Sequence, residues 1–291
     1  MNPVDDKQAL VRRDMWRRLD HAAKSLDNAD FVHEMTRNAL FDRLRPIVVD
    51  ADVVVDLGAA TGGSAQALSR LYRRARIIPL DLSRQMLAAA QHKKGWFSKQ
   101  TGVQADAARM PFADQSIDLV FSNLMLPWIN DPQAVFSEVS RVLRKGGLFS
   151  FATLGPDSFG QLRRAWNQVD PGGRHVAFFS DMHDLGDGLV RAGLADPVLD
   201  VDRLTISYSS PATLFRDLTM TGARNSLSGR KKSLFGKRRF RELCEALEGL
   251  AVDGAIPVDL ELVYGHCWGS GRAPAGDEVR LDAGQIPIRR R

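Results

Sequence analysis

Residues 53–63, with the sequence Val-Val-Val-Asp-Leu-Gly-Ala-Ala-Thr-Gly-Gly, constrain the fold of this chain more than any other stretch. Three consecutive β-branched valines are typical of a short strand that is buried on both faces of a parallel sheet. Asp56 follows where this strand would end, the small residues after it predict a tight turn, and the apolar spacing over 64–72 predicts a helix. A strand, a glycine turn and a helix in this order form a cradle in which the backbone can approach a nucleotide-type ligand closely.

The alternation of strands and helices continues along the chain to about residue 153. Further strands are predicted at 76–80, 100–105, 117–122 and 148–153, and helices at 83–91 and 131–143. Such regular alternation predicts an α/β fold, with a mostly parallel sheet and helices on both of its faces.

The composition changes along the chain and predicts its division into segments. We expect an N-terminal helical segment at 1–45, an α/β core at 46–208, a basic helical lid insertion at 209–256, a last sheet strand within 257–268 and a mobile tail at 269–291. An insertion just before the last strand would lie over the carboxyl edge of the sheet, which is where ligands bind in open α/β folds.

The overall composition excludes several classes of protein. A hydrophobic content of 44% is enough for a substantial core, yet no apolar run is long enough to span a membrane. The N-terminus lacks the order of a secretory signal, and the two cysteines, Cys244 and Cys267, do not form a CxxC pair. We therefore expect a cytoplasmic protein with free thiols, no membrane contact and no metal site.

Four polar residues each close a different predicted strand, namely Asp56, Asp81, Asp106 and Asn123. One such residue alone is also typical of a turn or a helix cap, but four in register line a single crevice and predict a nucleoside-containing ligand. Asp81 lies one βαβ unit after the glycine turn, where an acidic side chain accepts hydrogen bonds from ribose hydroxyls. Asp106 is placed to accept from an adenine amine, and Asp56 to accept from turn amides or, through water, from a cationic amine.

The same residues indicate which nucleoside is bound. Residues 58–63 fit the GxGxxG dinucleotide pattern only loosely, and Asp56 places a negative charge where a pyrophosphate would bind. A dinucleotide also leaves Asp106 and Asn123 unexplained. A cofactor with a cationic centre and an amino-acid end fits this acidic rim better, which favours S-adenosylmethionine.

Several short motifs between residues 53 and 153 resemble the successive motifs of class I methyltransferases. They are Asp56-Leu57-Gly58, Thr61-Gly62, Asp81-Leu82-Ser83 with Met86-Leu87, Asp106-Ala107 and Ser122-Asn123-Leu124. The resemblance implies that the cofactor is bound by Asp56, Gly58, Ala60, Thr61, Gly62, Asp81, Leu82, Met86, Asp106, Ala107, Asn123 and Leu124. Met86 by itself is also typical of a core residue.

A second set of motifs is similar to one family, the malonyl-acyl-carrier-protein O-methyltransferases of biotin synthesis. It comprises Thr153-Leu154-Gly155-Pro156, His175, Asp184-Leu185-Gly186 and Val263-Tyr264-Gly265-His266. The resemblance implies a Rossmann-like, seven-stranded, mostly parallel sheet with an antiparallel last strand and a helical lid. It also implies an enzyme that converts the free carboxylate of a malonyl thioester on acyl carrier protein into a methyl ester.

Two other functions stay open at this point. The segment 184–186 and Asn225 also match assembly-factor-like proteins that hydroxylate an arginine. A non-catalytic protein that binds S-adenosylmethionine is the other alternative.

The chain departs from the family pattern at three positions. Ala60 stands where glycine is usual, and we expect its φ to lie below zero because an L side chain disfavours the left-handed region. Leu26 replaces a common tyrosine, and Phe178 replaces a frequent arginine. We expect the latter two changes to affect the substrate side rather than the cofactor side.

The substrate implied by the resemblance requires a residue that binds its carboxylate rather than a general base that deprotonates it. A carboxylate is ionised at neutral pH and requires no general base, but its charge calls for a cationic or hydrogen-bonding partner. His175, Arg163 and Arg174 are the candidates because they follow the fifth strand, although a packed histidine, a helix-surface arginine and a loop arginine are the plainer interpretations. His175 is favoured because the resemblance covers it.

A basic segment from Arg230 to Arg241 contains seven lysines and arginines and no acidic residue. Such a segment is suited to steer an acidic acyl carrier protein, and a solvated helix face is the plainer interpretation. Nucleic-acid binding is disfavoured because nothing in the chain resembles a known RNA-reading module.

Overall fold

The computed structural model describes residues 9–93, 100–231 and 235–271. It contains one seven-stranded sheet of strand order β3-β2-β1-β4-β5-β7-β6, in which β7 runs antiparallel to both of its neighbours. The predicted fold class and the antiparallel last strand are thereby confirmed. The predicted tail at 269–291 falls almost wholly outside the described residues. Among the helices that the structure describes, none combines the length and apolarity needed to cross a membrane.

The strands are β1 (Val53–Leu57), β2 (Arg76–Asp81), β3 (Val103–Gln104), β4 (Ile117–Asn123), β5 (Leu143–Leu154), β6 (Leu194–Tyr208) and β7 (Ile256–Gly269). The helices are α1 (Arg12–Ala22), α2 (Phe31–Leu44), α3 (Gly63–Leu71), α4 (Arg84–Lys93), α5 (Pro132–Val142), α6 (Gly160–Val169), α7 (Met182–Arg191), α8 (Pro211–Met220) and α9 (Lys237–Glu248), with short 3-10 turns η1 (Leu26–Asn28) and η2 (Leu126–Trp128). The strand predicted at 100–105 shrinks to two residues because β3 pairs with β2 alone, at the edge of the sheet.

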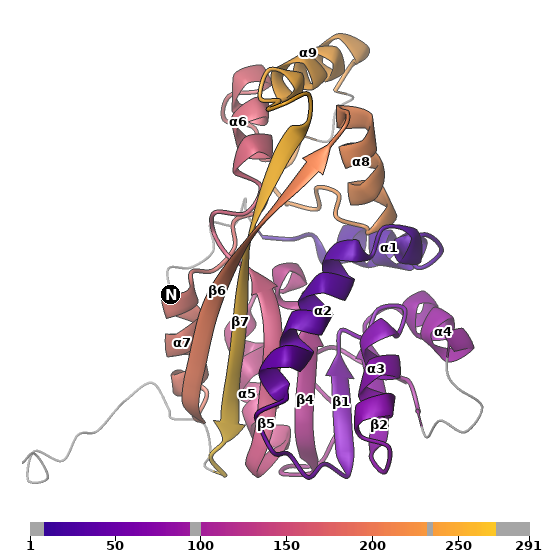
Figure 1. Cartoon of the computed structure of the whole chain (residues 1–291), viewed down its shortest axis with the longest axis vertical. Coiled ribbons are helices and arrows are strands. Elements are labelled where there is room, and N and C mark those ends of the chain that lie inside the picture. The colour runs from indigo at the N-terminus through magenta and orange to yellow at the C-terminus, as the bar shows by residue number, and fades with distance from the viewer. Residues whose placement is uncertain (1–8, 94–99, 232–234, 272–291) are drawn as a thin grey trace, which may run out of the picture.

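The central strands are buried on both faces, as the run of valines predicts. Val54 and Phe121 pack with the side chains of α2 and α3, whereas Val55 and Val120 pack with those of α5 and α7. Alternate residues of a strand point to opposite faces, so each strand contributes to both layers. This three-layer core fixes the carboxyl ends of β1, β2 and β4 side by side (Figure 1).

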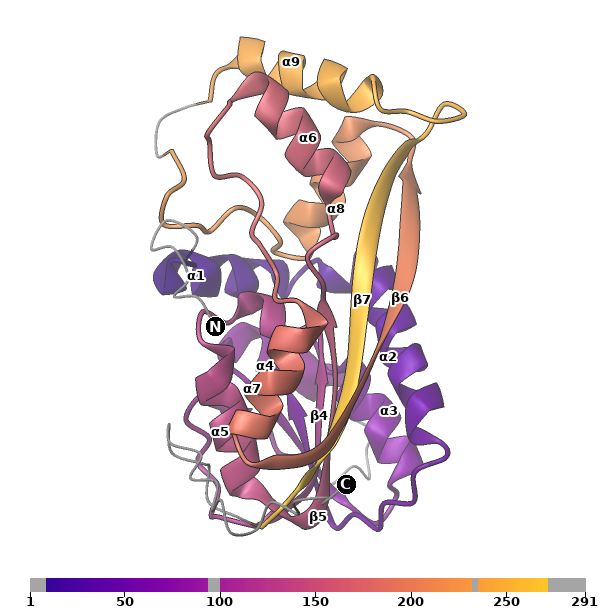
Figure 2. The ribbon, with the colours of Figure 1, turned by 90° about the vertical axis from the view of Figure 1, so that its left-hand side faces the viewer.

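β6 and β7 continue beyond the sheet as a two-stranded ribbon. The pairing of β5 with β7 ends at Leu154 and Leu262, but β6 and β7 stay paired as far as Tyr208 and Ile256. The distal ribbon together with α6, α8 and α9, here called the lid, forms a separate apolar cluster above the sheet (Figures 1 and 2). The range 46–208, which is predicted as the α/β core, therefore also contains α6, although this helix belongs to the lid. The buried apolar side chains of α6 pack against those of α9.

Helix α1 lies between the carboxyl ends of the strands and the lid (Figures 1 and 2). Arg18 donates to the carbonyl of Asn225, and Arg230 forms an ion pair with Asp14. Leu10 forms a bridge to Leu227 in the loop that follows α8. The N-terminal segment therefore joins the core to the lid and covers the edge at which the predicted site residues meet.

Candidate functional site

The glycine turn after β1 has a left-handed backbone at Gly58, Ala60 and Gly62, with φ values of 76°, 47° and 84°. The expectation of a negative φ at Ala60 is therefore wrong. The Ala60 amide donates to Asp81 Oδ2 at 2.9 Å, a hydrogen bond that offsets part of the cost of this conformation. At Gly58 a Cβ would lie 2.4 Å from Cγ of Met125, so this position accepts only glycine.

Asp81 organises the turn from the end of β2. Besides the bond from Ala60, its Oδ1 accepts from the amide of Ser83 at 2.8 Å. Burial raises the pKa of Asp81, while these backbone hydrogen bonds oppose that shift. The carboxylate retains further lone pairs toward the cleft that it lines, which suits the predicted contact with a ribose.

Asp56 is the least satisfied carboxylate at the site. It is only 1% exposed, and its Oδ2 has no hydrogen-bond partner among the described residues. Burial and the neighbouring charge of Asp81 raise the pKa of Asp56 to about 7, against the opposing effects of a backbone hydrogen bond from Ala65 and of the charge of Arg37. A buried, unpartnered carboxylate oxygen below the glycine turn matches the cationic part of S-adenosylmethionine.

A cleft of about 90 Å³ opens above this turn. Of the residues predicted to bind the cofactor, those that line it are Gly58, Ala60, Asp81, Leu82, Asp106, Ala107, Asn123 and Leu124. Four residues from the N-terminal segment also line it, namely Met15, Leu19, Leu26 and His33. Leu26 is expected on the substrate side from the sequence, and the structure places it in this cleft together with the predicted cofactor residues.

The other predicted cofactor residues lie around the cleft rather than in its wall. The Thr61 hydroxyl donates to Asp27 at 2.6 Å. Gly62 faces Ala90, where a Cβ would come within 2.7 Å of that side chain. Met86 is 1% exposed and packs with the N-terminal helical segment. These residues, like Asp56, shape the turn from behind.

Asp106 lines the cleft with both of its oxygens already engaged. Oδ2 forms an ion pair with Arg12 at 2.6 Å, and Oδ1 accepts from the amide of Ala108 at 3.0 Å. An adenine amine that donates to Asp106 therefore has to use the second lone pair of one of these oxygens, because each oxygen already accepts one hydrogen bond.

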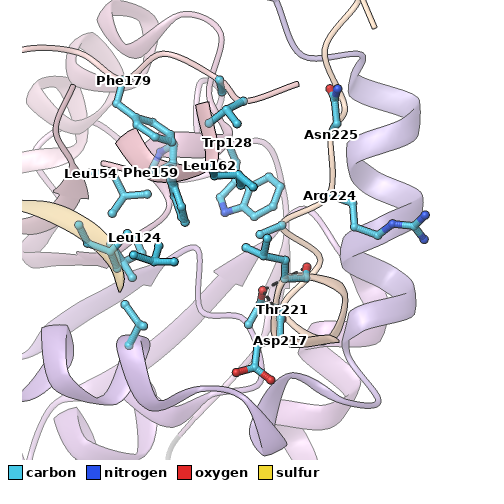
Figure 3. A pocket seen from close by; sticks show the side chains of 18 of the residues that line it. Leu124, Trp128, Leu154, Phe159, Leu162, Phe179, Asp217, Thr221, Arg224 and Asn225 are labelled. Carbon is cyan, nitrogen blue, oxygen red and sulfur yellow. Dashed lines mark hydrogen bonds between the residues drawn. The ribbon is translucent and has the colours of Figure 1, made fainter. Parts of the chain in front are cut away.

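A second cavity, of about 190 Å³, lies between the sheet edge and the lid and is called here the chamber (Figure 3). Its apolar wall includes Leu124, Trp128, Leu154, Phe159, Leu162 and Phe179. Its opposite side carries Asp217 and Thr221 from α8 and its following turn, and the Arg224 guanidinium points away from the cavity (Figure 3). The cleft and the chamber share four wall residues: His33, Leu124, Trp128 and Thr221. The cleft and the chamber are therefore adjacent.

His175 is the predicted substrate residue that lines the chamber. Its Nε2 lies 2.9 Å from Asp170 Oδ2, and its ring stacks on Trp166 with centroids 3.6 Å apart. Asp170 also pairs with Lys231, and these two partners lower the pKa of Asp170. The imidazole is thus held in one orientation at the chamber wall.

The two predicted arginines occupy other positions. Arg163 donates to the carbonyls of Ser158 at 2.5 Å and Ala177 at 3.3 Å, which fixes the loop that leads into the chamber wall. The carbonyl of Arg174 accepts from Asn225 at 2.6 Å. Neither arginine lines the chamber, so the structure brings only His175 of these three residues to it.

Sequence reasoning missed His33 and the N-terminal wall of the cleft. The apolar residues Met15 and Leu19 indicate an amphipathic helix, but helical spacing does not say which part of the molecule such a helix covers. His33 carries no motif at all. Phe178, the other departure from the family pattern, is 64% exposed and lies against the Arg163 guanidinium.

Comparisons with known proteins agree with the fold. A family described as "Methyltransferase domain" matches residues 55–151. Solved structures with the same fold include the YcgJ protein from Bacillus subtilis (TM-score 0.56, 17% identity, covering 79% of this chain and 97% of that one) and a putative methyltransferase from Bacillus halodurans (TM-score 0.57, 18% identity, covering 82% and 99%). The glycine turn, the strand-end carboxylates and this fold define a class I methyltransferase that uses S-adenosylmethionine.

Curated relatives identify the family within that class. The malonyl-[acyl-carrier protein] O-methyltransferase of Halorhodospira halophila is 39% identical over 100% of both chains. The protein of the same name from Laribacter hongkongensis is 39% identical over 91% of both chains. The chain belongs to the malonyl-[acyl-carrier protein] O-methyltransferase family.

Proposed function

We propose that the protein transfers a methyl group from S-adenosylmethionine to the free carboxylate of malonyl-acyl carrier protein. The observation that carries this proposal is the wall shared by the cofactor cleft and the chamber. A methyl donor in the cleft would lie beside the apolar chamber, which is proposed to receive the thioester-bound acyl group. The full-length relatives support the same substrate.

The residues of the chain supply binding and exclusion of water rather than acid–base chemistry. When bound, S-adenosylmethionine supplies a methyl group on a positively charged sulfur. Asp81 and Gly58, which line the cleft, would hold the cofactor against the turn, and the buried carboxylate of Asp56 behind the turn would favour its cationic part through charge. The apolar wall strips water from the substrate carboxylate, which is already ionised, and holds it in line for displacement.

His175 is proposed to bind the substrate within the chamber. Asp170 holds Nε2, so Nδ1 is the nitrogen left to meet a polar group of the malonyl thioester or its arm. Trp166 supports the ring from one face. Arg163 and Arg174 are proposed to act indirectly, through the loop that carries His175.

The exposed N-terminal part of α9 is the proposed docking surface for the carrier protein. Lys237, Arg238, Arg239 and Arg241 are exposed there. At the start of the predicted basic segment, Arg230 and Lys231 are engaged with Asp14 and Asp170, and Lys232 lies outside the described residues. The proposed surface is therefore narrower than the segment 230–241. It remains suited to an acidic partner.

The test is methyl transfer to a defined carrier protein. Malonyl-carrier incubated with the protein and S-adenosylmethionine should gain the mass of one methyl group, and acetyl-carrier, which lacks a free carboxylate, should gain none. Binding of S-adenosylmethionine without any methyl gain on malonyl-carrier would contradict the proposal and favour a non-catalytic binding protein. Asn225, which also matches hydroxylases, bonds to the Arg174 carbonyl and the Leu227 amide and so has a structural role in the lid loop.

A further inference from the structure

We infer that the imidazole of His33 donates a hydrogen bond to the substrate carboxylate and holds its attacking oxygen where the cleft meets the chamber, an inference that rests on the proposed function. Among the four residues shared by the two cavities, His33 is the one that titrates; the others are Leu124, Trp128 and Thr221. A group at this junction borders the path between the methyl donor and its acceptor. His175 lines the chamber but not the cleft.

The backbone holds His33 firmly at this junction. It lies in the first turn of α2, and its carbonyl accepts from Asn123 Nδ2 at 2.8 Å. Asn123 is itself at the carboxyl end of β4, one of the most buried strands of the core. The start of α2 is thereby tied to the edge of the sheet that carries the cofactor groups, so the ring is positioned by the core rather than by the lid.

The polar atoms around the junction lack partners within the protein. His33 Nδ1 and Asn123 Oδ1 are both shielded from solvent, and neither has a hydrogen-bond partner among the described residues. Nδ1 of His33 is buried and so does not face the cavities, which leaves Nε2 as the ring nitrogen that can meet a ligand there. A buried acceptor without a partner costs less free energy than a buried N–H without one. The unpartnered Nδ1 is therefore the nitrogen without a proton, and Nε2 carries the imidazole proton. Nε2 is then the donor available to the cavities that the ring lines.

The electrostatic state of His33 suits this role. Burial lowers the pKa of His33 to about 4, Asp30 opposes that shift, and Arg37 adds to it. The ring is therefore neutral at physiological pH. A protonated His33 would repel the positively charged sulfur. It would also form an ion pair with the carboxylate, and the lone pairs engaged in that ion pair would be less available to attack the methyl group. A neutral N–H orients the carboxylate without forming that ion pair.

Three variants whose side chains match one another in length separate hydrogen bonding from shape. His33→Gln keeps a neutral N–H donor, His33→Met has nearly the same shape without one, and His33→Glu replaces the donor with a charge. For each variant, kcat/KM is measured with malonyl-carrier, S-adenosylmethionine affinity by calorimetry, and folding by thermal unfolding. We expect Met and Glu to lower kcat/KM by about 100-fold and Gln by less than about tenfold. Cofactor affinity should stay within about threefold in the Gln and Met variants.

Two results would overturn the inference while leaving the proposed function intact. One is wild-type kcat/KM in the His33→Met variant. The other is a loss of cofactor affinity in His33→Met that matches its loss of rate, because His33 would then only support the cleft. If His33→Met does not fold, the comparison of His33→Glu with His33→Gln tests the inference instead. Equal kcat/KM values in these two variants would refute the hydrogen bond. Failure of the wild-type protein to methylate malonyl-carrier instead refutes the proposed function, and this inference with it.

Discussion

The α/β core and the lid bury their side chains in different ways. β4 is buried along its whole length, and parallel neighbours flank it on both sides. In the distal ribbon, Arg203 and Asp259 are exposed while Leu260 and Val258 are buried, so burial alternates along the strands. The core thus positions the cofactor groups through a continuous sheet, whereas the lid positions the chamber through one ribbon and three helices.

Few contacts join these two regions apart from the ribbon and α1. On the core side, Asn130 exchanges hydrogen bonds with the backbone of Leu10, which itself bridges to Leu227 in the lid loop. The lid has an apolar cluster of its own around Leu243 and Leu247. Cofactor binding and formation of the substrate chamber should therefore be separable by mutation.

The largest effect is expected in the core. Phe121 is fully buried in β4, and its ring stacks on Phe41 with centroids 5.0 Å apart. Phe121→Ala should lower the free energy of unfolding by about 3–5 kcal/mol because it leaves a cavity. Phe178→Ala is the matched control, since that side chain is 64% exposed. Urea unfolding measures both, and equal losses would show that Phe121 lies outside the stabilising core.

Removing a buried side chain from the lid should act locally. Leu243 is fully buried in α9, and Leu243→Ala should lower the stability of the lid by about 2–5 kcal/mol. Hydrogen exchange should rise in α6 and α9, methyl transfer should fall, and S-adenosylmethionine affinity should stay within about threefold. Leu68→Ala in α3, equally buried, should instead weaken cofactor binding. A parallel loss of cofactor affinity in Leu243→Ala would mean that core and lid unfold together.

The pH dependence of the core should follow Asp56. Its pKa is about 7 in the folded protein, above its ordinary value of 3.8, so folding favours the protonated form. That stabilisation is complete below the ordinary pKa and is lost as the pH rises through 7. Asp56→Asn should therefore stabilise the free protein by about 2–4 kcal/mol at pH 8 and by progressively less toward pH 4.

The same substitution should weaken cofactor binding. A cationic ligand favours the ionised carboxylate, so wild-type affinity for S-adenosylmethionine should rise between pH 6 and about pH 8. Affinity of Asp56→Asn should be lower and nearly constant over that range. Calorimetry at several pH values measures this, and identical pH profiles of the two proteins would remove Asp56 from the binding site.

The smallest effect is expected at the surface of the lid. Arg238→Glu with Arg239→Glu should lower kcat/KM for the carrier protein by about 5–10-fold at low salt, and the difference should disappear at high salt. Arg73→Glu with Arg74→Glu makes the same charge change on an exposed pair between α3 and β2. Indifference of the rate to the α9 change, or an equal effect of the control, would leave α9 as a solvated face.

The sequence by itself determined the class of fold and the grouping of the strand-end residues at one cleft. The valine run before Asp56 predicts β1 because a strand buried on both faces needs consecutive apolar residues. Polar residues at strand ends, such as Asp81 and Asn123, line one cleft because parallel strands end at the same edge. These are local patterns, and a local pattern is visible without knowledge of distant residues.

Only the tertiary structure decided how distant segments complete the site. The left-handed backbone of Ala60 depends on a hydrogen bond to Asp81, and Asp106 is paired with Arg12, which lies far from it in the chain. His33 gains its place because the start of α2 is tied to Asn123. No periodic pattern in the sequence reveals such contacts, because they depend on where whole helices pack. The packing of a helix in turn depends on the summed burial of many side chains.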